Sequence, residues 1–135
     1  MLRLIVFLRP FARYLFIFWL LTIIIVSSIP SIPTLKIHTS KSEIRLDYLI
    51  HFCEYGILAG MAFLTFVSSE FRLNATKFIL ITLSLMLFAI LDEYHQKLIP
   101  GRAFNLKDIY SNVAGIFGAL VFCVVVFKII SGNKS

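Results

Sequence analysis

Residues that could bind a ligand or transfer a proton are concentrated in three short stretches of the sequence. The first contains Asp47, His51, Glu54 and Tyr55. If this stretch is helical, the spacing places His51 and either Glu54 or Tyr55 on the same face as Asp47. A carboxylate beside an imidazole can exchange a proton with it, so His51 is a candidate general base. The ordinary alternative is that Asp47 stabilises a helix N-terminus and that His51 makes a hydrogen bond inside a bundle.

The second stretch runs Asp92-Glu93-Tyr94-His95-Gln96. In a helix, Asp92 and Gln96 lie four residues apart and Glu93 and Gln96 lie three apart, so either pair can share a face. Two carboxylates at the C-terminal end of a helix oppose its dipole and are locally unfavourable. A proton or a cation should compensate them, which makes Glu93 a second candidate acid or base. The residues that could supply the positive charge are Lys97, Arg102 and His51.

The third stretch begins with the turn signal Pro100-Gly101. Asn105 followed by Asp108 has the spacing of a helix N-cap with an acidic residue three positions on. Asn112 lies on the same face as Asp108 and needs a partner within an apolar helix. Arg102 beside this helix N-terminus would suit a phosphate or a carboxylate. Because no His-x-x-x-His or Cys-x-x-Cys spacing occurs, we predict neither a metal nor a cofactor.

The elements that carry these residues are expected to be membrane-spanning helices. The chain has 135 residues, of which 59% are hydrophobic, and so short a domain cannot bury that much apolar surface in water. Four apolar stretches can each cross about 30 Å of hydrocarbon. Gly56-x-x-x-Gly60 in the second of them permits close helix packing. We therefore predict a single all-α domain over residues 1–135, a four-helix transmembrane bundle with spans at about 11–29, 46–67, 75–91 and 108–130.

Flanking charges set the expected topology of this bundle. The first apolar run exceeds the core of a cleaved signal peptide and no A-x-A site follows it, so we expect a retained helix. Arg3, Arg9 and Arg13 cluster around the start of this helix, which favours cytoplasmic N- and C-termini in the cell membrane. The three polar stretches then share the extracytoplasmic end. The net charge of +6 comes from residues that flank apolar runs, so membrane lipids rather than nucleic acid are the expected partners.

Three motifs in the sequence combine these residues. They read Asp47-x-x-x-His51-Phe52-x-x-Tyr55, then Asp92-Glu93-x-x-Gln96-x-x-x-Pro100-Gly101-Arg102, then Asp108-x-x-x-Asn112-x-x-Gly115-x-x-Gly118. In their order and spacing they resemble the VanZ-like family of bacterial membrane proteins. The resemblance implies a helical membrane protein, and the founding member of the family is associated with low-level resistance to the glycopeptide teicoplanin. The motif positions mark a candidate ligand-binding site of Asp47, His51, Tyr55, Glu93, Gln96, Arg102, Asp108 and Asn112.

Three hypotheses about function follow from these residues. In the first, the chain is an envelope protein whose outer polar pocket binds a lipid headgroup, a lipid-linked cell-wall component or a glycopeptide. In the second, it is an enzyme that acts on such a lipid, with His51 or Glu93 as the acid or base and Arg102 holding phosphate. In the third, the polar residues only lock the helices together. We rank binding first, with catalysis, homo-oligomer formation and a resistance role left open.

Overall fold

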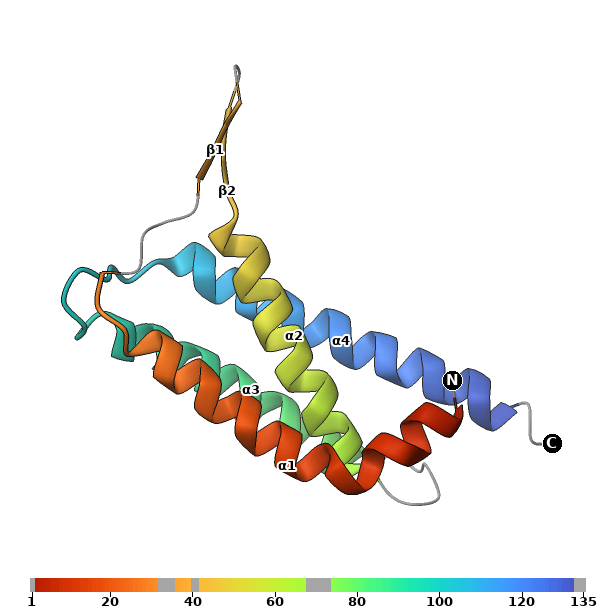
Figure 1. The fold of residues 1–135 in the computed structure, drawn as a ribbon. Coiled ribbons are helices and arrows are strands. Elements are labelled where there is room, and N and C mark those ends of the chain that lie inside the picture. Colours follow the sequence, from red (N-terminus) through yellow and green to blue (C-terminus); the bar gives the residue numbers. More distant parts are fainter. Residues whose placement is uncertain (1, 32–35, 40–41, 68–73, 133–135) are drawn as a thin grey trace.

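Four long helices account for most of the chain in the computed structural model, which describes residues 2–31, 36–39, 42–67 and 74–132. Each helix is long and apolar enough to cross a membrane. The predicted all-α fold with four membrane-spanning helices is therefore confirmed. In chain order the helices are α1 (Leu2–Ser27), α2 (Asp47–Phe66), α3 (Ala75–Gln96) and α4 (Leu106–Gly132), as Figure 1 shows.

The helix boundaries differ from the predicted spans where the polar residues lie. α3 continues past the predicted limit at residue 91 and ends at Gln96. α4 begins at Leu106, ahead of the predicted residue 108. The apolar run defined the expected limits, whereas backbone hydrogen bonding continues through polar residues until a capping group or turn ends it. As a result the carboxylates of the second stretch lie inside the last turns of α3.

α1 is the one helix with an internal proline among those described. Pro10 lies within α1, and the helix bends in its N-terminal part in Figure 1. A proline lacks the N–H that would bond the preceding turn, and its ring crowds the carbonyl four residues earlier. A bend at this position is therefore expected, and the candidate membrane span begins at Pro10.

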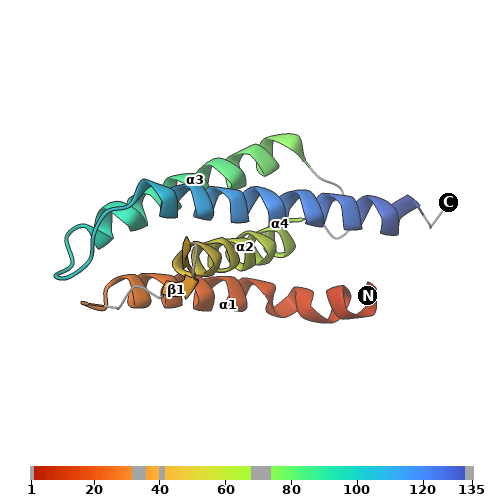
Figure 2. The ribbon, with the colours of Figure 1, turned by 90° about the horizontal axis from the view of Figure 1, so that it is seen from above.

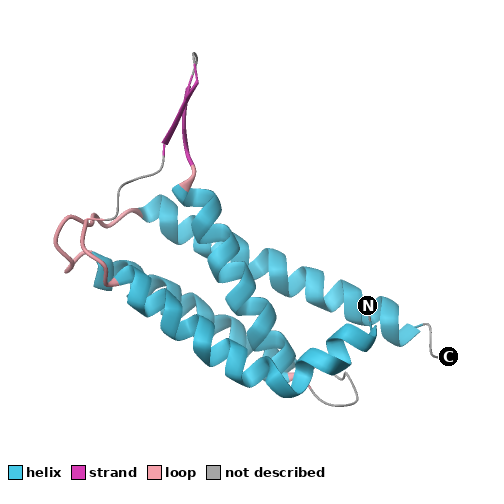
Figure 3. Ribbon diagram, viewed as in Figure 1, coloured by secondary structure: helices cyan, strands magenta, loops and turns pink. Residues whose placement is uncertain are grey.

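A short hairpin between α1 and α2 was not predicted from the sequence. β1 (Lys36–Thr39) pairs antiparallel with β2 (Ser42–Arg45), and Ile37 lies opposite Ile44. Figure 3 shows this hairpin projecting away from the helices. A two-stranded hairpin of this size has little stability of its own, which explains why the eight paired residues carry so weak a sequence signal.

The core of the bundle is centred on α2, which contacts each of the other three helices. Seen from above in Figure 2, α2 lies between α1 on one side and α4 and α3 on the other. Phe63 of α2 and Phe127 of α4 pack edge to face with ring centroids 5.0 Å apart. Large apolar side chains also point outward, as at Phe18 and Phe122, each 66% exposed. Such outward residues suit a lipid surrounding. The buried apolar core comprises Ile23, Tyr55, Leu58, Ala59, Ala62, Phe63, Val67, Leu85, Ala89, Ile116, Leu120 and Phe127.

The closest approach of two helices occurs where α2 crosses α4. A Cβ added at Gly115 would overlap the carbonyl oxygen of Phe52, whereas one added at Gly56 would meet Gly115 at 3.4 Å. Gly60 has no neighbour within 4 Å of such a Cβ. Gly56 therefore lies at a helix contact as the Gly56-x-x-x-Gly60 spacing suggested, but Gly60 does not.

Candidate functional site

The end of α3 is bound to α2 through a buried carboxylate. Tyr55 donates its hydroxyl to Oδ2 of Asp92 at 2.9 Å, and Gln96 donates Nε2 to the same oxygen at 3.2 Å. All three side chains are buried. The two bonds fulfil the expectation that Asp92 and Gln96 share a helix face. Together they place two donors on one oxygen, which stabilises the carboxylate inside the bundle.

Glu93 joins the end of α3 to the start of α4. Its side chain is 0% exposed, and Oε1 accepts a 2.7 Å hydrogen bond from the backbone N–H of Asn105. The second oxygen, Oε2, is also buried but has no hydrogen-bond partner among the residues that the structure describes. A buried carboxylate oxygen without a donor is unusual, since most buried polar groups are paired.

Asn105 caps α4 in a modified form of the predicted capping arrangement. Its Oδ1 accepts from the backbone N–H of Lys107 at 3.1 Å, and its Nδ2 donates to Oδ1 of Asp108 at 3.0 Å. In an ordinary capping box the acidic side chain would accept from the backbone N–H of the cap residue. Here that N–H donates to Glu93, so Asp108 bonds the side-chain amide instead.

His51 of α2 lies against Asp108. Nε2 of the imidazole is 3.8 Å from Oδ2 of the carboxylate, a distance at which a protonated histidine forms an ion pair. Nδ1 of His51 is buried and has no partner in the described part of the chain. The carboxylate–imidazole pair expected from the sequence is thus present, but it joins α2 to α4 rather than linking two residues of α2. Asp47 lies one turn earlier, in the first turn of α2, and is half-buried.

Asn112 is the most isolated polar side chain of the site. It is 0% exposed and lies one helical turn beyond Asp108. Neither Oδ1 nor Nδ2 finds a hydrogen-bond partner within the described residues. The partner that we expected on another helix is therefore not among them. Burying an amide without partners costs stability, so a group outside the described contacts would be favourable here.

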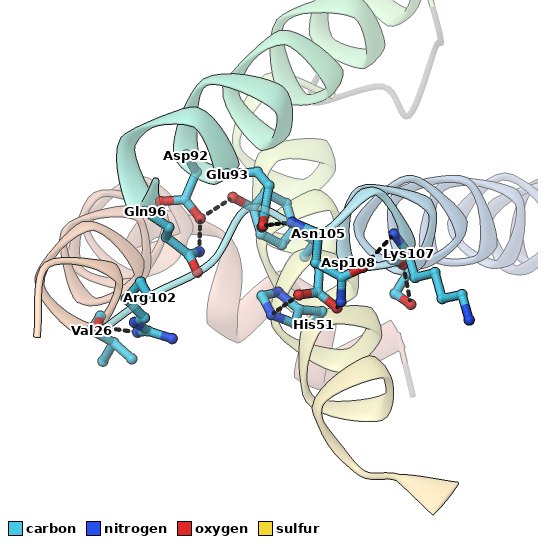
Figure 4. Close-up of polar contacts among 11 residues, drawn as sticks. Val26, His51, Asp92, Glu93, Gln96, Arg102, Asn105, Lys107 and Asp108 are labelled. Carbon is cyan, nitrogen blue, oxygen red and sulfur yellow. Dashed lines mark hydrogen bonds and ion pairs between the residues drawn. The ribbon is translucent and has the colours of Figure 1, made fainter. Parts of the chain in front are cut away.

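Arg102 makes hydrogen bonds that the sequence did not indicate, and its predicted role in ligand binding stays a prediction. Nη2 donates to the carbonyl oxygen of Val26 at 2.8 Å and Nε donates to that of Ile29 at 3.3 Å. Val26 lies in the last turn of α1 and Ile29 lies two residues past its end, a region where backbone acceptors lack helical partners and attract cations. Figure 4 shows Arg102 beside Val26 at the left, while His51 and Asp108 meet nearer the centre of the view. In its described hydrogen bonds Arg102 thus contacts the end of α1, and it also lies within electrostatic range of Glu93 and Glu54.

The turn before Arg102 reinforces this attachment to α1. The N–H of Arg102 donates to the carbonyl of Ile99, which closes a turn with Pro100 second and Gly101 third. Gly101 has a positive φ of 77°, and a Cβ there would collide with Ser31. The N–H of Ser31 in turn donates to the carbonyl of Pro100 at 3.1 Å. Glycine is required at this turn both by its backbone conformation and by the close approach of Ser31.

The side chains that meet at this end of the bundle form what we call the polar cluster. α2 and α4 begin here and α3 ends here, so three helices contribute (Figure 4). No three His, Cys, Asp or Glu side chains of the described ranges come together as metal ligands would. The members of the polar cluster are His51, Tyr55, Asp92, Glu93, Gln96, Asn105, Asp108 and Asn112.

Comparison with known protein families assigns the chain to one of them. The sequence model of the VanZ/LLP1 family matches residues 4–128, nearly the whole length. The chain belongs to the VanZ/LLP1 family. No curated protein and no solved structure matches it significantly. The resemblance drawn from the three motifs is thus confirmed.

Four hydrogen bonds of this VanZ/LLP1 protein could not be found by sequence reasoning. The donor to Glu93 is the backbone N–H of Asn105, and the acceptors of Arg102 are backbone carbonyls of α1. Every residue type carries such groups, so no residue pattern indicates them. Trp19 likewise donates its indole N–H to the backbone carbonyl of Glu54 at 2.9 Å and so joins α1 to α2.

Proposed function

We propose that this VanZ/LLP1 protein is a bacterial cell-envelope membrane protein whose polar cluster binds the polar part of a membrane lipid or a lipid-linked cell-wall component. The observation that carries the proposal is the set of buried polar atoms without partners among the described residues. They are Oε2 of Glu93, both amide atoms of Asn112 and Nδ1 of His51.

These atoms favour a binding site over a structural lock. A polar network that only holds helices together is favourable when each member is satisfied, and it is worse than an apolar core when half of its members are not. The bonds of Asp92 and Asn105 fit a lock, because Oδ2 of Asp92 and both amide atoms of Asn105 have partners within the chain. Glu93 and Asn112 do not fit it. Ionisable and amide groups inside a membrane-spanning bundle commonly mark a functional site.

The proposed location of the site follows from the distribution of charge. With Arg3, Arg9 and Arg13 on the cytoplasmic side, both termini are cytoplasmic and the polar cluster lies toward the outer face of the cell membrane. Lipid-linked cell-wall components and glycopeptide antibiotics would be met on that face. This placement links the site to the teicoplanin resistance that the family resemblance implies.

The proposal is tested by antibiotic susceptibility and protein abundance measured together. Wild type and Glu93→Gln are expressed in a susceptible Gram-positive host, with Glu43→Gln in β2 as a control that also removes one carboxylate. We expect wild type and Glu43→Gln to reduce teicoplanin susceptibility, and an equally abundant Glu93→Gln to leave it unchanged from the host alone. Loss of Glu93→Gln from the membrane would instead indicate a structural lock. If wild type has no effect, the resistance link is wrong in that host.

One observation favours a second candidate, an enzyme acting on a lipid-linked phosphate. His51 has Nε2 next to Asp108 and Nδ1 unpartnered within the described contacts, as in a general base oriented by a carboxylate. The expected reaction is attack of water on a lipid-linked diphosphate, with His51 taking a proton from the water, to give the lipid phosphate and inorganic phosphate. Purified protein should then release phosphate from such a lipid, and His51→Gln should not. The engagement of Arg102 with α1 weakens this candidate, because the expected phosphate ligand is already used.

A further inference from the structure

We infer that the polar cluster recognises a hydroxyl group of its ligand, which donates a hydrogen bond to Glu93 and accepts one from Asn112. This inference rests on the proposed binding function and deepens it, because it names the chemical class of the group that enters the site. Both side chains are 0% exposed and keep polar atoms without partners among the described residues.

The hydrogen-bonding capacity left at Glu93 and Asn112 is of two kinds. Oε2 of Glu93 can only accept when the carboxylate is ionised, whereas the amide of Asn112 has one accepting oxygen and one donating NH2 group. A hydroxyl has one donor and two acceptor positions, so it can bond both side chains at once. An ionised phosphate has no proton for Glu93, and an ammonium has no acceptor for the NH2 group. Of the three groups, the hydroxyl matches both side chains.

Asn112 is directed toward α2 by the contacts on either side of it along α4. Asp108, one turn earlier, lies 3.8 Å from His51. Gly115, three residues later, would bring an added Cβ against the carbonyl oxygen of Phe52. Residues at these spacings share one helix face, so Asn112 lies on the side of α4 that packs on α2. It therefore faces the part of α2 that carries His51, whose Nδ1 also lacks a partner in the described part of the chain.

Glu93 is held in position before any ligand binds. Its Oε1 accepts from the backbone N–H of Asn105 at 2.7 Å, which fixes one end of the carboxylate against the start of α4. A group that is already positioned loses little freedom when a ligand binds, and affinity increases accordingly. Oε2 is therefore a pre-positioned acceptor for the proton of a ligand hydroxyl.

Opposite charges of the protein already lie near one another at this site. Arg102 lies within electrostatic range of Glu93 and Glu54, and His51 lies beside Asp108. A charged ligand group that reaches buried side chains loses its water shell, at a cost far above that of a neutral hydroxyl. A hydroxyl also leaves the existing balance of charge undisturbed. A neutral ligand group therefore fits the site better than a charged one.

Two sources present hydroxyl groups on a lipid anchor. One is the glycerol headgroup of a membrane phospholipid, and the other is the sugar of a lipid-linked cell-wall component. Because Glu93 and Asn112 are fully buried, either source reaches them only when the helices separate at this end of the bundle. A hydroxyl at the tip of a headgroup requires less separation than a phosphate with its ester oxygens.

The inference is tested with the full chain purified in detergent and examined by native mass spectrometry with two pairs of ligands. Phosphatidylglycerol is compared with phosphatidylpropanol, which has the same phosphate and a three-carbon headgroup without hydroxyls. A sugar linked to a polyprenyl diphosphate is compared with the same compound after O-methylation of its hydroxyls. Charge is equal within each pair. We expect the member with free hydroxyls to bind about tenfold more tightly in one pair or in both.

Two variants connect this preference to the named atoms. Asn112→Leu should remove it and leave the protein folded, because an apolar side chain of similar size replaces an amide without described partners. Glu93→Gln keeps an oxygen for Asn105 but turns an NH2 group toward the ligand, so the preference for a donating hydroxyl should fall. Glu43→Gln in β2, a control that also removes one carboxylate, should keep the preference. Thermal unfolding shows whether each variant is folded.

The outcomes separate the inference from the proposed function. A preference in the phospholipid pair alone identifies a lipid headgroup, and one in the sugar pair alone identifies the cell-wall component. Equal binding within both pairs, or tighter binding of the members without hydroxyls, overturns the hydroxyl inference but keeps lipid binding. If no ligand is retained, the proposed binding function is itself wrong.

The variants supply a separate check on the location of the site. A preference that Asn112→Leu and Glu93→Gln both keep would place the hydroxyl site elsewhere and overturn the inference. If one of the two fails to fold, the other decides the result. Failure of both to fold would show that these side chains hold the helices together, and this would also overturn the inference.

Discussion

The backbone N–H of Asn105 and Oε1 of Glu93 lie 2.7 Å apart, and this hydrogen bond joins the last turn of α3 to the first residue before α4. It uses the N–H that would otherwise close a capping box with Asp108. The same carboxylate keeps its other oxygen without a partner among the described residues. One oxygen of Glu93 therefore makes a structural hydrogen bond, and the other is an acceptor without a partner in the described part of the chain. Different substitutions of Glu93 can test the two oxygens separately.

Glu93→Gln and Glu93→Ala should differ in stability. Glutamine keeps an oxygen that can accept from Asn105, whereas alanine leaves that buried N–H without an acceptor. We expect the alanine variant to be less stable than the glutamine variant by about 1–3 kcal/mol. Thermal unfolding of the purified proteins in one detergent would measure the difference. Equal stability would mean that the bond to Asn105 contributes nothing to the fold.

Tyr55→Phe removes one of the two donors to Asp92 without changing the shape of the ring. A hydrogen bond to an ionised group contributes about 1.5–3 kcal/mol, and the loss should fall in that range. Tyr94→Phe serves as the matched control, because Tyr94 is exposed and its ring packs on Phe104. The measurement is again the unfolding temperature. A Tyr55→Phe protein as stable as the control would show that the buried bond is not a source of stability.

A double-mutant cycle would show whether the two donors act together. Tyr55→Phe and Gln96→Leu each remove one bond to the same oxygen of Asp92. Because the residues share a partner, we expect an interaction term of about 0.5–3 kcal/mol in the combined variant. Additive losses would mean that Asp92 does not couple α2 to the end of α3.

Arg102→Ala should loosen the end of α1 specifically. The substitution removes both donors to the carbonyls of Val26 and Ile29, and the expected loss of stability is about 1–2 kcal/mol. Amide hydrogen exchange should rise at residues 28–31 more than in the centre of α2. Lys97→Ala, at an exposed position beside the same loop, is the control. Uniform exchange throughout the bundle would contradict a local capping role.

Gly115→Ala and Gly60→Ala should have opposite effects. A methyl group at Gly115 overlaps the carbonyl of Phe52 and forces α2 and α4 apart, which should cost about 1–3 kcal/mol or more. At Gly60 the methyl group meets nothing within 4 Å, so the better helix propensity of alanine should add about 0.5–1 kcal/mol. Unfolding temperatures of the two variants give the comparison. A tolerated Gly115→Ala would contradict the close crossing.

Spacing predicted the parts of the site that depend on helical periodicity. The shared face of Asp92 and Gln96, the cap at Asn105 and the gathering of polar residues at one end of the bundle all follow from the order and length of the helices. The contacts of Arg102 could not be predicted from residue spacing, because its acceptors are backbone carbonyls that become available only where α1 ends. The hairpin at residues 36–45 was also missed, since eight paired residues of mixed polarity carry no strong signal.

The order of the helices along the chain has a consequence for how the protein is made. Asn105, Asp108 and Asn112 are the last members of the polar cluster to leave the ribosome, and Glu93 and His51 are already in the nascent chain by then. Helices inserted earlier therefore carry carboxylates and an imidazole before their neighbours on α4 have been synthesised. Ionisable side chains without these neighbours are costly in hydrocarbon. Insertion of α4 should complete the polar cluster, so chains that end before Leu106 should be held by the insertion machinery or degraded.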